Sequence, residues 1–133
     1  MCWREIKDNP WLYATTAAAV AKLPEEHRPS APADPFAPGP FSLADLDHTH
    51  ALLRKTGFND VRMNKLDDVM RLGDEQSALG YLTELGPVGS ALKKVPPEQA
   101  VAAKQAMLEV LRSYATDAGL NVPSATWIVT AKA

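Results

Sequence analysis

Two histidines close together, His48 and His50, are the first residues whose type could do chemistry, because imidazole is a common metal ligand. In a helix, residues two positions apart point about 200° away from each other, so this pair cannot chelate one ion as histidines four positions apart can. No nearby set of cysteines or carboxylates completes a tetrahedral site. We therefore expect a solvated or half-buried helix surface here, and no metal site.

Carboxylates occur in two close pairs, Asp45 with Asp47 and Asp67 with Asp68, and carboxylates can serve in general acid–base catalysis. Neighbouring carboxylates at the ends of helices and strands are more often caps or turn formers. Nothing in the sequence places either pair at a catalytic separation, so the catalytic residues stay unknown. The glycines form neither G-x-G-x-x-G nor a Walker pattern, which removes the usual routes to nucleotides.

The single cysteine, Cys2, excludes an internal disulfide and could act as a nucleophile only beside a base or a cation. Arg4 is near in sequence, but we expect Cys2 to be a small apolar residue that ends a strand. Trp11 and Tyr13 cannot share one helical face. One of these two aromatic side chains is therefore expected to face a pocket or a partner while the other packs in the core.

Composition and charge exclude several classes of protein. The chain has 133 residues, of which 46% are hydrophobic, and we expect one globular domain over residues 1–133. The net charge of −2 leaves no basic stripe for a phosphate backbone, so nucleic acid is not an expected partner. No apolar run approaches the roughly 20 residues that cross a bilayer, and no signal-peptide pattern is present. We expect a cytoplasmic protein without a membrane partner.

Helical patterns cover most of the chain. Asn9 is a good N-cap with Pro10 at the first helical position, and Ser42 with Asp45 resembles a capping box. A further helical stretch should be split near Leu85 by Gly86-Pro87. The predicted helices are residues 9–23, 42–56 (ended by Gly57), two short helices within 74–94, and 97–118 (ended by Gly119).

The strand signal is weaker and comes from residues 58–66 and 125–131, where apolar residues alternate with polar ones. Residues 24–40 hold six prolines and form a loop, either a connector or a wall over a pocket. The predicted fold class is α+β, mostly helical, with a small antiparallel two-stranded sheet.

Several short motifs occur in an order that resembles the C-terminal half of class I S-adenosylmethionine-dependent methyltransferases, of the type 11 and ubiquinone-biosynthesis-like group. The similarity spans nearly all of the chain. The motifs are Cys2-Trp3-Arg4, Asn9-Pro10-Trp11-Leu12, Pro38 to Asp45, Leu52-Leu53, Gly57 to Val61, Leu85 to Val88 and Trp127 to Ala131.

The resemblance implies a remnant of a Rossmann-like fold. Cys2-Trp3-Arg4 would end the fifth strand, residues 58–66 would be the sixth, and residues 125–131 would be an antiparallel seventh strand inserted between them. The proline loop would cover the substrate, and the helices of residues 74–118 would shape the pocket of a small-molecule methyl acceptor. The residues expected nearest that substrate are Trp3, Arg4, Asn9 and Trp11.

The family's glycine-rich loop and its acidic residue after the second strand have no counterpart in the chain. The intact family uses S-adenosylmethionine, but we expect no cofactor on this truncated chain alone, and no activity without a donor-holding half. An exposed edge on the seventh strand would favour self-association or a complementing chain. The alternatives are a small helical interaction module or a ligand-binding module, both without catalysis.

Overall fold

The computed structural model describes residues 1–30, 34–84 and 86–133, and its residues form two compact units. The first unit comprises Met1–Asn9, Pro32–Asp68 and Ser124–Ala133. The second unit comprises Pro10–Ala31 and Val69–Pro123. Of the predicted elements, part of the proline loop and Leu85 lie outside the described residues.

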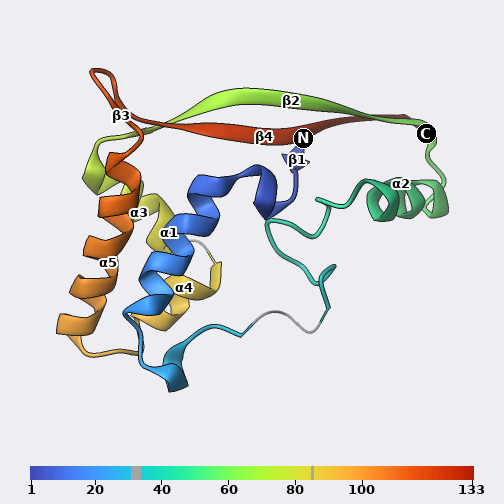
Figure 1. The fold of residues 1–133 in the computed structure, drawn as a ribbon. Helices are drawn as coiled ribbons and strands as arrows, with labels where there is room; N and C mark the ends of the chain where they lie inside the picture. The colour runs from blue at the N-terminus through green and yellow to red at the C-terminus, as the bar shows by residue number, and fades with distance from the viewer. Residues whose placement is uncertain (31–33, 85) are drawn as a thin grey trace. The chain divides into compact units, whose positions relative to one another are not determined.

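The sheet has four strands in the order β1–β4–β2, and β3 also pairs with β4 (Figure 1). The strand β1 is antiparallel to β4 with Cys2 opposite Trp127, and β3 is antiparallel to β4 with Ala115 opposite Leu120. The two long strands, β2 and β4, contribute residues to both units. The strands are β1 (Cys2–Trp3), β2 (Asn59–Gly73), β3 (Ala115–Thr116) and β4 (Gly119–Lys132).

The prediction of a two-stranded sheet is therefore wrong, although the mixed α+β class holds. The extended chain continues to Gly73 where a strand end was expected near residue 66, and β4 already begins at Gly119. In the strand order β4 lies between β1 and β2, but β1 has two residues and pairs with β4 only at Thr126 and Trp127. Among the described residues, the part of β4 beyond Trp127 therefore has a strand neighbour only in β2, and its other side is an edge of the sheet, as are β1 and β2.

The second unit is built from α1 (Pro10–Ala21), α3 (Glu75–Glu84), α4 (Gly86–Leu92) and α5 (Pro97–Arg112). Figure 1 shows α1 lying along α5, and this is the most extensive helix pair of the unit. Small residues permit the close approach, since the buried positions include Ala19 of α1 and both Ala103 and Ala106 of α5. Larger side chains fill the rest of this interior, among them Trp11, Leu23, Leu82, Met107, Leu111 and Val122.

The predicted split into two short helices is confirmed, since α3 ends at Glu84 and α4 begins with Gly86-Pro87. Gly86 has φ of +67°, a left-handed conformation that glycine adopts without strain. Gly89 allows α4 to approach α3 closely, because a Cβ at this position would lie 2.0 Å from the carbonyl oxygen of Thr83.

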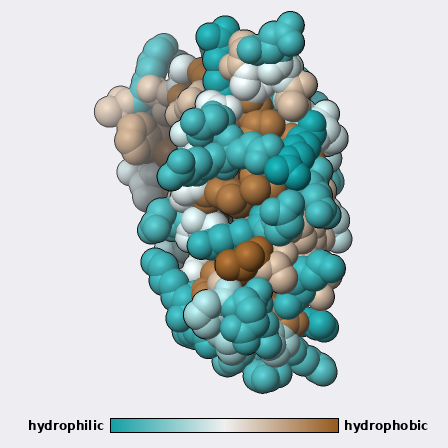
Figure 2. Space-filling view, turned by 90° about the vertical axis from the view of Figure 1, so that its left-hand side faces the viewer, coloured by the Kyte–Doolittle hydropathy of each residue, from teal (hydrophilic) through white to brown (hydrophobic). Residues whose placement is uncertain are grey.

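The predicted end of the longest helix is wrong, since α5 stops at Arg112 and not near residue 118. Residues 115–120 instead form a tight hairpin in which Gly119 has φ of +99°. Figure 2 views the side of the molecule on which α5 lies and shows hydrophilic side chains interleaved with narrow hydrophobic strips. Val101 of this helix is 65% exposed.

The first unit contains one α-helix, α2 (Leu46–Lys55), in its described part. Its N-cap is Asp45, whose carboxylate accepts a hydrogen bond from the backbone N–H of His48 at 2.7 Å, so Ser42 does not have the predicted capping role. Gly57, with φ of +99°, follows the end of the helix as expected. None of the described helices of either unit is long and apolar enough to cross a membrane.

Candidate functional site

Two places in the described structure gather polar side chains. The first unit has a cluster around Arg4 where β1 meets β4, and we call it the Arg4 cluster (Arg4, Asp8, Asn9, Asp67 and Trp127). The second unit has an open groove between residues 26–30 and α4.

Asn9 forms the buried end of the Arg4 cluster. Its amide is fully enclosed and makes two hydrogen bonds with the backbone of Ala125: Nδ2 donates to the carbonyl at 3.2 Å, and Oδ1 accepts from the N–H at 2.9 Å. A side-chain amide has one donor and one acceptor side, so it can pair with a peptide group as a neighbouring strand would. The amide of Asn9 therefore extends the β1–β4 pairing. The sequence had predicted that Asn9 would cap the following helix, and it does not have this role.

Arg4 lies beside this amide and is 9% exposed. Its backbone N–H donates to the carbonyl of Ala125 at 3.1 Å, and its guanidinium pairs with Asp67 and, at 3.2 Å, with Asp8. The guanidinium also lies 5.6 Å from the ring centroid of Trp127, which is within the range of a cation–π contact. Two carboxylates and a ring face thus compensate the loss of hydration of this cation.

Trp127 fixes the same cluster from β4. Its indole Nε1 donates to the carbonyl of Ala44 at 2.8 Å, and its side chain is 8% exposed. The neighbouring hydroxyl of Thr126 donates to the carbonyl of Leu66 at 3.3 Å. The polar groups of the cluster are therefore engaged with the chain itself, so the cluster is a rigid support.

The sequence predicted Trp3, Arg4, Asn9 and Trp11 as substrate-binding residues. The structure brings Trp3, Arg4 and Asn9 together at the β1–β4 junction, with Trp3 opposite Thr126 and half-buried. Trp11 belongs to the second unit, where its side chain is fully buried. Its indole Nε1 has no hydrogen-bond partner within the described part of the chain.

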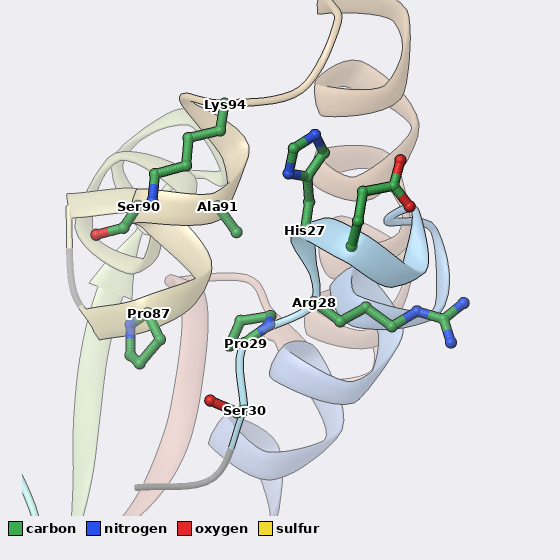
Figure 3. Close-up of a pocket in the computed structure, with 9 residues that line it drawn as sticks. His27, Arg28, Pro29, Ser30, Pro87, Ser90, Ala91 and Lys94 are labelled. Atoms are coloured by element: carbon green, nitrogen blue, oxygen red, sulfur yellow. The ribbon is translucent and has the colours of Figure 1, made fainter.

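The groove of the second unit encloses about 470 Å³. In Figure 3, Pro29 and Ser30 lie on one wall and Pro87 and Ala91 of α4 lie on the other, while the Arg28 side chain points away. The Arg28 guanidinium is instead turned back, and its Nε donates to the carbonyl of Leu23 at 3.0 Å. Proline rings make both walls stiff, because their φ angles are fixed.

Polar groups line the same groove. The Lys94 side chain runs along α4 toward Ser90, and the imidazole of His27 lies across the gap (Figure 3). An ammonium, an imidazole and the hydroxyls of Ser30 and Ser90 can bind a small polar molecule that carries carboxylate, carbonyl or hydroxyl oxygens. The density of prolines left open a connector or a wall over a pocket, and no sequence signal pointed to Lys94 or His27.

His48 and Cys2, two residues of reactive types, make contacts within the chain. The ring of His48 stacks on Phe36 with a centroid distance of 3.7 Å. Cys2 donates to the carbonyl of Leu43 at 3.4 Å, and burial raises the pKa of its thiol. Over residues 1–30, 34–84 and 86–133, no group of three His, Cys, Asp or Glu side chains could hold a metal ion.

Comparisons of the chain with protein-family models, with curated proteins and with solved structures give no match.

Proposed function

We propose that this chain is the substrate-side portion of an S-adenosylmethionine-dependent methyltransferase that acts in the cytoplasm. In this proposal, the chain holds a small-molecule methyl acceptor and depends on a complementing segment or chain to hold the methyl donor.

The strand order is the observation that carries the proposal. The resemblance implied that residues 125–131 would be inserted, antiparallel, between the strand of Cys2-Trp3-Arg4 and the strand of residues 58–66. In the structure, β4 lies between β1 and β2 and runs antiparallel to β1. Strand pairs between segments so far apart in sequence are not a consequence of local propensity, so this agreement supports the proposal.

The groove of the second unit supports the proposal of an acceptor site. Its walls come from the two segments that the resemblance assigned to the acceptor: the proline-rich loop, through residues 26–30, and the helices of residues 74–118, through α4. A pocket with an ammonium, an imidazole and hydroxyls suits an acceptor that has oxygen substituents. This favours substrate binding, although a binding module without catalysis would use the same groove.

The residues present do not fit S-adenosylmethionine. The residues that line the groove include no glycine, and no glycine-rich strand–loop–helix occurs in the sequence. We therefore assign no methyl-transfer step to this chain alone.

Titration calorimetry of the chain with S-adenosylmethionine tests the first part of the proposal. We expect no binding in the micromolar range by the chain alone. Micromolar binding would place a donor site within these 133 residues and would contradict the proposal.

The second part of the proposal, the need for a complementing chain, can be tested at the outer edge of β1. Because the N–H of Arg4 faces β4, strand alternation turns the N–H of Trp3 toward the outer edge. A donor-holding half of a methyltransferase of the same group, expressed separately, should bind the chain and regain S-adenosylmethionine binding. Trp3→Pro removes the outward N–H and should abolish the complex, while the matched Trp3→Phe should retain it. Absence of a complex with the unaltered chain would count against the proposal.

A further inference from the structure

The outer edge of β2 is a long and exposed strand edge. The strand has 15 residues, and within the described structure its only strand neighbour is β4. Figure 1 shows β2 along the border of the sheet. Such an edge offers backbone donors and acceptors to another strand, and many proteins protect against this with charges or a covering helix.

The orientation of the backbone around Leu66 shows which groups face outward. The carbonyl of Leu66 accepts from the hydroxyl of Thr126 in β4, so the backbone polar groups of Leu66 face β4. Along a strand these groups alternate in direction. The N–H and C=O groups of Lys65 and Asp67 therefore face the outer edge, and the side chains of Lys65, Leu66 and Asp67 are exposed.

Antiparallel pairing of this edge with a second copy can be centred on different residues, and charge distinguishes the alternatives. A two-fold axis at Leu66 places Leu66 opposite Leu66 and Lys65 opposite Asp67, twice. Moving the axis by one residue places Lys65 opposite Lys65 or Asp67 opposite Asp67. Opposite charges in directly facing positions stabilise a strand pair and like charges destabilise it, so one register is favoured.

The side chains can make these contacts while they keep their contacts within the chain. Asp67 remains 71% exposed although its Oδ1 pairs with Arg4. Leu66 is 37% exposed, so an apolar partner would remove part of its surface from water. Since the axis at Leu66 makes this a non-hydrogen-bonded pair, the two leucine side chains would approach closely.

We propose that β2 pairs antiparallel with β2 of a second copy of this chain, with the two-fold axis at Leu66. The pairing joins the outer edges of two sheets, with an ion pair between Lys65 and Asp67 on each side of the axis. This inference is independent of the proposed methyltransferase role, because it uses the edge opposite to β1.

The mass of the unaltered chain, measured by light scattering over a range of concentrations, is the first test. We expect a dimer at high concentration. Lys65→Pro should abolish it, because proline removes an outward N–H that the chain does not use within its own sheet. Lys65→Glu should weaken the dimer about tenfold, because both ion pairs become repulsive. Lys55→Glu changes the net charge equally on α2 and should leave the dimer unchanged.

Cross-linking tests the register. In a Cys2→Ser background, Leu66→Cys should form an intermolecular disulfide on mild oxidation, while Asn64→Cys should not, because its two copies would lie well apart. Circular dichroism melting of each variant shows whether it is folded. A monomer at every concentration, an unchanged dimer in folded Lys65→Pro, or equal cross-linking of the two cysteine variants would overturn the proposal.

Discussion

The two units differ in what fills their interiors. Most of the buried apolar side chains described belong to the second unit, whereas the first unit contributes Ala44, Ala125 and Trp127. The buried polar side chains described show the reverse, since Arg4, Asn9, Thr49 and Thr126 belong to the first unit and only Thr15 belongs to the second. The second unit is therefore stabilised mainly by packing, and the first mainly by hydrogen bonds and the ion pairs of Arg4 with Asp8 and Asp67.

This difference shows that one chain can depend on two kinds of interaction, which respond differently to a mutation. Packing is non-directional and tolerates small displacements, whereas a buried polar group is costly when its partner is lost. The interior of the first unit is thus less forgiving of a chemical change than its small apolar content suggests.

Truncation of the apolar interior should have the largest effect. Leu111 is fully buried in the second unit, and Leu111→Ala should lower the free energy of unfolding by about 2–5 kcal/mol, because it leaves a cavity. Denaturant unfolding followed by circular dichroism measures the change. Val101→Ala on the same helix removes an exposed side chain and should change stability by less than about 0.5 kcal/mol. Equal effects of the two variants would contradict the assignment of this interior.

Removal of the Asn9 amide tests the polar interior of the first unit. Asn9→Ala leaves the N–H and C=O of Ala125 without their side-chain partner and should cost about 1–3 kcal/mol. Hydrogen exchange at the Ala125 amide, measured by NMR, should become faster in the variant. Unchanged exchange would show that Asn9 does not extend the pairing of β4.

A helix cap in the first unit should have a smaller effect. Asp45→Ala removes the acceptor for the N–H of His48 and should cost about 1 kcal/mol, since α2 loses one of its capping bonds. Asp45→Asn retains an acceptor and should recover most of the stability. Thermal unfolding by circular dichroism compares the two variants with the unaltered chain.

The smallest effect concerns the surface pair of Glu75 and Arg112 in the second unit, which join at 2.7 and 2.9 Å. The guanidinium of Arg112 lowers the pKa of Glu75. A carboxylate whose pKa is lower in the folded state contributes stability above its unfolded pKa of about 4.3, and this is lost as the pH falls through the folded value. Glu75→Gln should therefore flatten the decline of stability below about pH 4, measured by urea titrations at several pH values.

Local signals in the sequence predicted where the helices lie, although not all of their ends and caps. Pro10 marks the start of α1, and Gly86-Pro87 marks the break between α3 and α4, because proline and glycine constrain the backbone wherever they occur. The strands were less predictable. The extension of β2 beyond Leu66 and the hairpin at Gly119 depend on pairing with β4, which no local pattern encodes.

The candidate sites were also only partly predictable, because their residues come together through contacts between distant parts of the sequence. The resemblance grouped Trp3, Arg4, Asn9 and Trp11, and the structure places the first three at one junction while Trp11 is buried in the second unit. The sequence could not reveal that Asn9 bonds with Ala125, which lies 116 positions away. Lys94 and His27 likewise meet at one groove only after the chain has folded.

The thiol of Cys2 is a chemical probe for the end of the first unit's sheet. It lies on β1 opposite Trp127 and is partly buried, and burial raises its pKa. Alkylating reagents react with the thiolate, so labelling should be slower than that of a free thiol at the same pH. A variant that weakens the pairing of β1 with β4 should therefore be labelled faster than the unaltered chain.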